Sequence, residues 1–449
     1  MAQYSLTCLD KQQRSLAVSW LYIAVGFLLA SGIYPLLLAL ARTTYEMPWK
    51  DFFYTALVLH VDFTVLWWLL GIAGVFWTLN SSLRWATFNK LAMVFVVIGG
   101  VIVAIAPLLD AANPLTNNYV PMLENRYFIK GLIMFGAGVF LIALVGLVNA
   151  LQAWDDKSET GSIYFGMTTA AAITMGAILC VAWTFFNIPS DMELGRSYYE
   201  LLFWAGGHVL QFTHTALLMV AWLLLGSICG IKLPISSKVI WWLFAISLVM
   251  VLAGPLAFVQ YDLQDPNFTV WFVWLMRDGN GVAPMIAGIA VLWGLLQVKN
   301  QSVHYIKAGL VFSITLFATG GALGLFVAES STLITAHYHG SIVAVTMAFM
   351  AMTYHWLPQF GFKSPSIRLA TVQVYAYAIG QFMHVIGLAW GGGHGMKRKV
   401  VGTTQDIGVQ AWITPQDLVG AGGVIAVLSG ILFAAVVLPV MLKGRKEEA

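Results

Sequence analysis

The sequence predicts an all-α integral membrane protein, a bundle of twelve transmembrane helices. Of the 449 residues, 59% are hydrophobic and only 10% are charged, whereas soluble globular proteins carry about 25% charged residues. The apolar residues also gather into runs of roughly 20, the length that a helix needs to cross about 30 Å of hydrocarbon. These observations exclude a soluble enzyme, a disordered chain and a secreted disulfide scaffold.

Twelve apolar runs follow one another along the chain, with short polar segments between them. Because no connection is long enough to hold another domain, we expect residues 1–449 to form a single membrane domain. The polar N-terminal segment has no cleavage-site pattern, so we expect no removable signal peptide. The runs cover residues 17–41, 53–79, 91–109, 129–152, 162–186, 199–228, 238–259, 269–297, 306–328, 333–357, 368–391 and 418–442.

The distribution of charge predicts the orientation in the bilayer. The net charge of +3 is too small to indicate a nucleic-acid partner. With both termini in the cytoplasm, most of the 23 lysines and arginines lie on the inner side, as the positive-inside rule requires. We therefore expect a protein of the bacterial cytoplasmic membrane. Lys397, Arg398 and Lys399 form a basic cluster on the outer side, against this bias, and the cluster predicts a local anionic partner.

Histidines rather than cysteines are the candidate cofactor ligands. The three cysteines are isolated, without a CxxC or CxxCH motif, which excludes a thiolate zinc site and covalently attached haem. In the expected topology the second, sixth and tenth spans enter from one face, and their first turns carry His60, His208, and the pair His337 and His339. Ionisable residues inside a span indicate function, so we expect a common cofactor layer. For any single histidine the alternative is a hydrogen bond to a neighbouring helix.

The spacing of the pair constrains the cofactor. His337 and His339 are two residues apart, so their side chains leave a helix about 200° apart. They are poorly placed to chelate one ion, but each can ligate a separate flat cofactor on its own side of the helix. A planar macrocycle held by an axial histidine is a haem. We therefore expect two haems, with the tenth helix between them.

The candidate histidines and the basic cluster lie in four longer stretches. They are LHVDFTVLWWLLG (59–71), FWAGGHVLQF (203–212), ITAHYHGSIVAVTMAFMAMTYHWLPQFGF (334–362), and FMHVIGL (382–388) followed by GMKRK (395–399). These stretches resemble, in order and over nearly the whole chain, motifs of the catalytic subunit of the haem–copper oxidase superfamily, of the cytochrome c oxidase subunit I or nitric oxide reductase large subunit type. The resemblance implies twelve core helices and two haems.

The resemblance also implies roles for single residues. His60 and His339 would be the axial ligands of a low-spin haem, expected to be of b type, and His337 the proximal ligand of a high-spin haem whose type stays open. The basic cluster would pair with haem propionates. His384 would face a propionate or simply pack. We expect ordinary packing or interfacial roles for the other histidines of the chain, His214, His304, His355 and His394.

The distal metal site departs from the family pattern. The family holds copper or non-haem iron with one histidine on helix six, here His208, and an adjacent pair on helix seven. Phe258 and Val259 occupy the place of that pair. One imidazole does not hold such a metal in an apolar cavity, so the second metal is in doubt. A substitute site remains open as an alternative, built from His208, Gln211, Gln260, Tyr261 or Asp262.

The same departures leave two functions open. Oxygen-reducing members carry a tyrosine where this chain has Phe212, and nitric oxide reductases carry a carboxylate there or nearby, where this chain offers only the uncharged Gln211. The first hypothesis is a respiratory oxidoreductase. Electrons from a periplasmic cytochrome c or cupredoxin subunit, or from quinol, would pass from the low-spin to the high-spin haem. There a small gas, nitric oxide in preference to oxygen, would be reduced or rearranged at the side of His208. The alternative is a non-catalytic dihaem subunit for gas binding or electron transfer.

Acidic residues inside the spans give no sign of proton pumping. Asp62, Glu200 and Glu329 are expected toward the outer side, and no series of carboxylates leads inward. Intramembrane carboxylates are the usual members of proton relays. We therefore expect no pump built on carboxylates, whereas proton transfer through threonine, serine and water stays open as an alternative.

Overall fold

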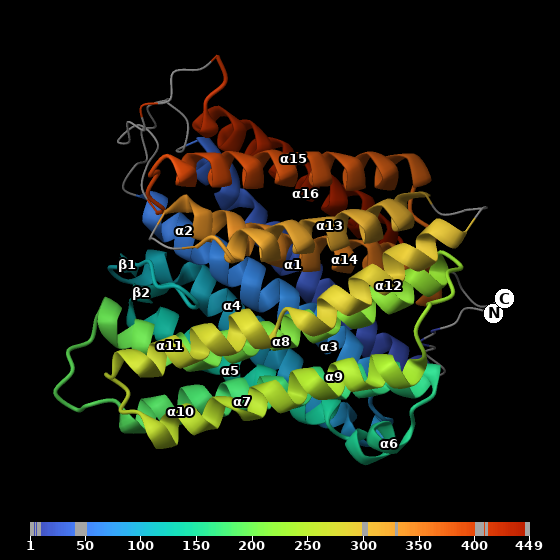
Figure 1. Cartoon of the computed structure of the whole chain (residues 1–449), viewed down its shortest axis with the longest axis horizontal. Coiled ribbons are helices and arrows are strands. Elements are labelled where there is room, and N and C mark those ends of the chain that lie inside the picture. Colours follow the sequence, from blue (N-terminus) through green and yellow to red (C-terminus); the bar gives the residue numbers. More distant parts are fainter. Residues whose placement is uncertain are drawn as a thin grey trace. The chain divides into compact units, whose positions relative to one another are not determined.

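The computed structural model is all-helical apart from one short hairpin, and it describes residues 4, 6, 10–40, 52–298, 304–327, 331–399, 408 and 412–444. Twelve helices among these residues are long and apolar enough to cross a membrane (Figure 1). The predicted fold class is thereby confirmed, and the chain is an integral membrane protein. Residue 41 of the first run, residue 328 of the ninth and the acidic Glu329 lie outside the described residues.

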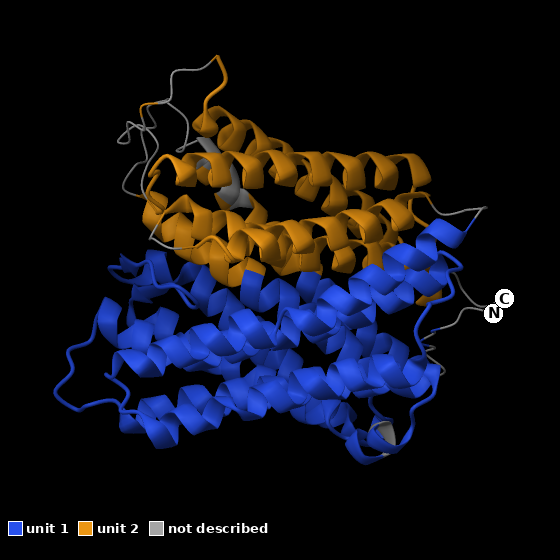
Figure 2. Cartoon of the chain, viewed as in Figure 1, with its two compact units in different colours: residues 1–24, 65–300 blue, residues 25–64, 301–449 orange. Residues whose placement is uncertain are grey.

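The chain divides into two compact units (Figure 2). Unit 1 comprises Met1–Ala24 and Val65–Asn300, and unit 2 comprises Val25–Thr64 and Gln301–Ala449. Two spans belong in part to each unit. They are α1 (Lys11–Leu40) and the second span, which runs from α2 (Phe53–Asp62) through a π-helical turn, η2 (Phe63–Trp68), into α3 (Leu69–Leu79).

Unit 1 contains most of the helices and the hairpin. Its close helix contacts depend on glycine: a Cβ added to Gly99 of α4 would lie 2.6 Å from the Gly131 carbonyl of α5. The elements of unit 1 after α3 are η3 (Leu83–Trp85), α4 (Ala86–Leu109), β1 (Asn113–Leu115), β2 (Met122–Glu124), α5 (Arg126–Gly146), α6 (Ala150–Asp155), α7 (Glu159–Asn187), α8 (Arg196–Ile228), α9 (Ser237–Leu252), α10 (Gly254–Gln260), α11 (Pro266–Trp274), η4 (Leu275–Gly279) and α12 (Val282–Gln297).

Three predicted spans differ in detail from the observed helices. The third starts at Leu83 rather than at residue 91, because charged side chains near a helix end can reach the interface while the helix continues. The seventh breaks into α9 and α10 at Ala253, directly before Gly254 and Pro255. A proline removes a backbone donor and blocks the preceding turn, which explains the break. The eighth span is divided by the π-helical turn η4.

Unit 2 contains the two helices that carry most of the candidate ligands, α14 (Thr332–Gln359) and α15 (Ile367–Gly393). They pack against α13 (His304–Gly324) and α16 (Pro415–Leu442). α13 and α14 approach closely at two glycines: a Cβ added to Gly340 would lie 2.6 Å from the Gly320 Cα. Ser313 fixes the same pair by donating its hydroxyl to the Ala344 carbonyl at 2.7 Å. Such an approach of two backbones requires glycine, as in other tightly packed membrane helices.

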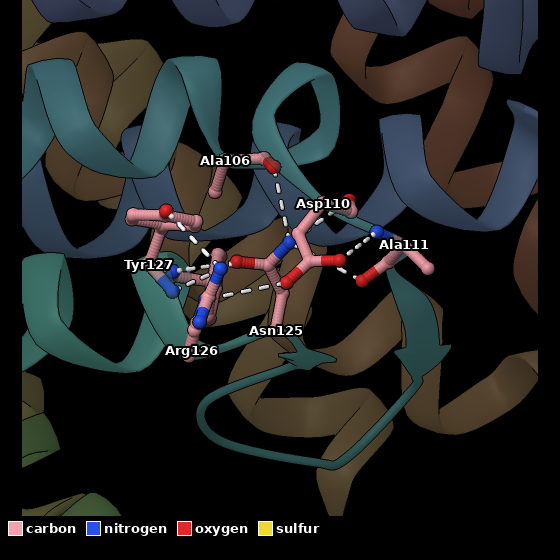
Figure 3. A network of polar contacts seen from close by, with 7 residues as sticks. Ala106, Asp110, Ala111, Asn125, Arg126 and Tyr127 are labelled. Carbon is pink, nitrogen blue, oxygen red and sulfur yellow. Dashed lines mark hydrogen bonds and ion pairs between the residues drawn. The ribbon is translucent and has the colours of Figure 1, made fainter.

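The connection between α4 and α5 is ordered by a polar network at its base (Figure 3). The Asn125 Oδ1 accepts from the backbone N–H groups of Tyr127 and Phe128 and so caps α5. Its Nδ2 donates to three carbonyls at the end of α4, those of Ala106, Asp110 and Ala111. Arg126 Nε lies 3.3 Å from an Asp110 carboxylate oxygen. The antiparallel strands β1 and β2 extend from this base, paired from Asn113↔Glu124 to Leu115↔Met122.

Candidate functional site

The imidazole of His337 lies against α13. Its Nδ1–H is donated to the Gly320 carbonyl at 2.7 Å. A Cβ at Gly324 would lie 2.6 Å from the same nitrogen, so the absence of a side chain there leaves room for the ring. Helix α13 therefore determines both the position and the tautomer of His337.

His339 contacts a different helix, α15. Its ring centroid lies 4.8 Å from that of His384, with an interplanar angle of 38°. Its Nδ1 lies 3.2 Å from the Thr335 carbonyl, and the His384 Nδ1–H is donated to the Val419 carbonyl of α16 at 2.9 Å. His337 and His339 thus have separate neighbours, as their two-residue spacing predicts, and they do not converge on one ion.

The backbone holds the basic cluster at the beginning of α14. Lys397 forms an isolated antiparallel bridge with Ser331, and the Thr332 N–H is donated to the Met396 carbonyl at 2.8 Å. Met396 is itself buried, in a small core with Ala336. The three cationic residues consequently lie within a few residues of the first turn of the helix that carries His337.

His60 belongs to the same unit and is half-buried in α2. Its Nδ1 lies 3.4 Å from the Thr64 hydroxyl. Asp62 is completely buried two residues later, and neither of its carboxylate oxygens has a hydrogen-bond partner in the part of the chain that the structure describes. Unit 2 thus carries all four histidines that the sequence analysis assigns to haem or to its immediate surroundings.

The histidines of α14 and α15 have the chemistry of haem ligands. In His337, His339 and His384 the Nδ1–H faces a backbone carbonyl, and this leaves the lone pair on Nε2. Metal-binding histidines are oriented in this way by a hydrogen bond from the other ring nitrogen. All three rings are only half-buried. Nearby, the buried Thr335 hydroxyl has no partner among the described residues. The residues of unit 2 fit bound haem.

His208 lies in unit 1, enclosed by aromatic rings. Its side chain is 1% exposed, and its Nδ1–H is donated to the Trp204 carbonyl at 2.7 Å. The ring centroids of three aromatic residues surround the imidazole, at 4.5 Å for Tyr119, 4.8 Å for Trp204 and 6.2 Å for Phe272. Gln211 is half-buried one turn further along α8, and the completely buried Phe212 follows it.

The residues around α10 do not fit a second metal. Phe258 packs against Phe268 and Phe272, with centroids 5.1 and 5.9 Å apart. Val259 is 85% exposed, and the side chains of Gln260 and Asp262 are exposed as well. Within the described residues, no three of the His, Cys, Asp and Glu side chains come together as a metal site. Copper or iron would have His208 as its only imidazole here, and one such donor is insufficient.

The other four histidines lie away from these contacts. His214 is buried in α8, and its Nε2 has no partner among the described residues. His304 and His394 are exposed, and His355 is half-buried. None of these positions conflicts with the packing or interfacial roles expected of them.

The sequence does not predict that Tyr119 and Trp204 contact His208. Tyr119 comes from the connection between α4 and α5, some 90 residues before His208, and no periodicity relates a loop residue to a distant helix. The sequence does contain one signal, the pair Gly206 and Gly207 directly before His208. Paired glycines in a helix indicate the close approach of another segment, but they do not identify that segment.

These observations define a membrane protein with twelve candidate spans among its described residues and with half-buried histidines on α2, α14 and α15. Residues 15–425 match the family described as Cytochrome C and Quinol oxidase polypeptide I, and the chain belongs to this family. Members of the family generally bind haems.

Two relatives cover much of the chain. The sequence is 28% identical to an uncharacterized protein of Rickettsia prowazekii (strain Madrid E), over 97% of this chain and 98% of the relative. It is 27% identical to an uncharacterized protein of Aquifex aeolicus (strain VF5), over 76% of this chain and 85% of the relative. The assignment to the family itself rests on the match over residues 15–425.

Proposed function

We propose that this chain is a membrane haem oxidoreductase that reduces or rearranges a small gas, nitric oxide in preference to oxygen. One observation carries the proposal. The two imidazoles of α14, those of His337 and His339, direct Nδ1 to backbone carbonyls and leave Nε2 for a metal. Because the chain belongs to an oxidase family, we assign oxidation–reduction chemistry to this arrangement.

Each histidine has a distinct role in the proposal. His60 and His339 would hold a low-spin haem of b type, and His337 would hold a high-spin haem. The chemistry supplied by two bound haems would be electron transfer and an iron position open to a diatomic gas. The protein would fix the orientation of each ligand, through the Gly320 carbonyl in the case of His337. The basic cluster would neutralise the haem carboxylates.

Phe212 and the surroundings of His208 favour nitric oxide. Phe212 is completely buried and has no hydroxyl with which to donate a proton or an electron.

In the proposal the chain is one membrane domain in the bacterial cytoplasmic membrane, with both termini in the cytoplasm. Because a c-type haem motif is absent from the sequence, electrons would come from a periplasmic cytochrome c or cupredoxin subunit, or from quinol.

A specific observation favours a second function, that of a non-catalytic dihaem subunit for gas binding or electron transfer. Phe258 packs among aromatic rings and Val259 is exposed, so the residues at the place of the distal histidine pair offer no metal ligand. A protein without a second metal would still bind gas at a haem, but it would lack the metal that, together with the haem, usually reduces that gas.

Purified protein distinguishes these two functions. Its haem content, its metal content by mass spectrometry and its consumption of nitric oxide and oxygen should be measured on one preparation. Two haems per chain together with nitric oxide consumption would support the oxidoreductase. Two haems with reversible gas binding but no turnover of either gas would support the non-catalytic subunit. A preparation from native membranes without haem would contradict both.

A further inference from the structure

The strongest unexplained contact in unit 1 joins a loop residue to a helix histidine. The Tyr119 ring packs in a tilted arrangement against the imidazole of His208, with centroids 4.5 Å apart and an angle of 49° between the planes. The same ring contacts Trp204 edge-on, at 5.8 Å and 88°. Because the His208 Nδ1–H is already donated to the Trp204 carbonyl, these two aromatic residues together determine where the remaining nitrogen, Nε2, points.

Helix α8 has a gap that Tyr119 fills. A Cβ added to Gly207 would lie 2.2 Å from the Tyr119 Cγ and 2.5 Å from its Cβ. These atoms belong to the beginning of the side chain and cannot swing away as the end of a flexible side chain can. A residue larger than glycine at position 207 would therefore displace Tyr119 from His208.

The segment that carries Tyr119 is fastened to α8 by a single carboxylate. Glu200 accepts hydrogen bonds from the Asn117 Nδ2 at 3.2 Å and from the Asn118 backbone N–H at 3.1 Å, and also from the Asn118 Nδ2. The Asn117 Nδ2 in addition donates to the Arg196 carbonyl at 2.8 Å. Charge-assisted hydrogen bonds of this kind are stronger than neutral ones. With the Asn125 network at its base (Figure 3), the connection is held at both ends.

We propose that Tyr119 is a positioning residue of the His208 site. Glu200 holds its ring against the imidazole by binding the neighbouring Asn117 and Asn118, and the absence of a side chain at Gly207 leaves room for the ring. Its ring covers one face of the imidazole and keeps reagents away from Nε2. The role of His208 in gas chemistry rests on the proposed function, but the contact between the two rings does not. The test therefore uses a property of His208 that is independent of haem and of turnover.

The experiment is the modification of each histidine by diethyl pyrocarbonate in the full-length, haem-loaded protein, followed by peptide mass spectrometry. This reagent attacks unprotonated imidazole nitrogen, so the rate at His208 reports how well it is covered. In Tyr119→Ala and in Gly207→Ala we expect the rate at His208 to rise about tenfold, because the first variant removes the covering ring and the second displaces it. Tyr119→Phe keeps the ring and should stay within about twofold of the wild type. Glu200→Ala should raise the rate by an intermediate factor.

His214 on the same helix is the internal reference, and two variants serve as controls. Gly136→Ala adds a methyl group where nothing lies within 4 Å, and Tyr127→Ala removes a tyrosine ring that contacts Arg126 rather than His208 in the described part of the chain. Both should leave the His208 rate unchanged.

An unchanged rate in Tyr119→Ala and Gly207→Ala would overturn the proposal, and so would an equal rise at His214, since that would show general loosening of α8. An unchanged modification rate of His208 in Glu200→Ala would show that the Glu200 carboxylate does not hold Tyr119 in place. Absence of gas turnover would contradict only the proposed function.

Discussion

The Gly320 carbonyl of α13 accepts the Nδ1–H of His337 from α14 at an N···O distance of 2.7 Å. The bond exists because the two helices approach so closely that position 320 has no space for a side chain. Close packing and ligand orientation are therefore one property of this helix pair. A change in the helix contact should alter the histidine as well.

Gly320→Ala should destabilise unit 2. Its new Cβ would lie 2.5 Å from the Ser341 nitrogen and 2.8 Å from the Gly340 carbonyl carbon, both backbone atoms. Forcing such an atom into a packed contact costs about 1–3 kcal/mol, so the midpoint of thermal unfolding should fall by several degrees. Gly321→Ala is the matched control, because nothing lies within 4 Å of a Cβ there. Equal midpoints for the two variants would show that the helices do not depend on this contact.

His337→Ala and His60→Ala should have opposite spectroscopic effects. Without the His337 imidazole, the proposed high-spin haem loses its protein ligand, so the spectral change on adding carbon monoxide should disappear while the low-spin bands remain. His60→Ala should remove the low-spin bands and keep the response to carbon monoxide. Optical difference spectra of the purified variants provide the measurement. The exposed His304→Ala is the control, and identical spectra for the first two variants would refute the assignment of the ligands.

Restoring histidines at positions 258 and 259 should fail to create a copper site. The Phe258 ring contacts Phe272, which in turn contacts His208, whereas Val259 is 85% exposed. The double variant Phe258→His, Val259→His would therefore place one imidazole in the aromatic cluster and the other facing away. Two imidazoles with no third ligand do not satisfy the coordination of copper or iron. Mass spectrometry of the purified double variant should find no metal beyond the haem iron, and one extra copper per chain would contradict the side-chain directions described here.

The sequence predicts the spans well and the surroundings of His208 poorly, for a physical reason. A span must be apolar over about 20 residues because of the bilayer itself, so its signature is local and strong. The opposite directions of His337 and His339 follow equally from the helical repeat. By contrast, the contact of Tyr119 with His208 depends on how a hairpin folds back on a distant helix. In the sequence, Gly207 is the one residue that indicates this contact. The exposure of Val259 likewise depends on how α10 is oriented after the seventh span breaks at Ala253, which no local pattern predicts.

Asn125→Ala should weaken both the fold and the cover of His208. The variant loses the cap of α5, usually worth about 0.5–2 kcal/mol, and the three bonds from Nδ2 to the end of α4. The midpoint of thermal unfolding should fall, and diethyl pyrocarbonate should modify His208 faster because the connection that carries Tyr119 loses its base. Asn113→Ala is the matched control, since the exposed Asn113 side chain donates, among the described residues, to the half-buried Glu124 within the same hairpin. If Asn125→Ala lowers the midpoint without changing the rate at His208, then the contacts of Asn117 and Asn118 with α8 suffice to hold Tyr119 in place. The base of the hairpin then contributes to stability but not to the position of the ring.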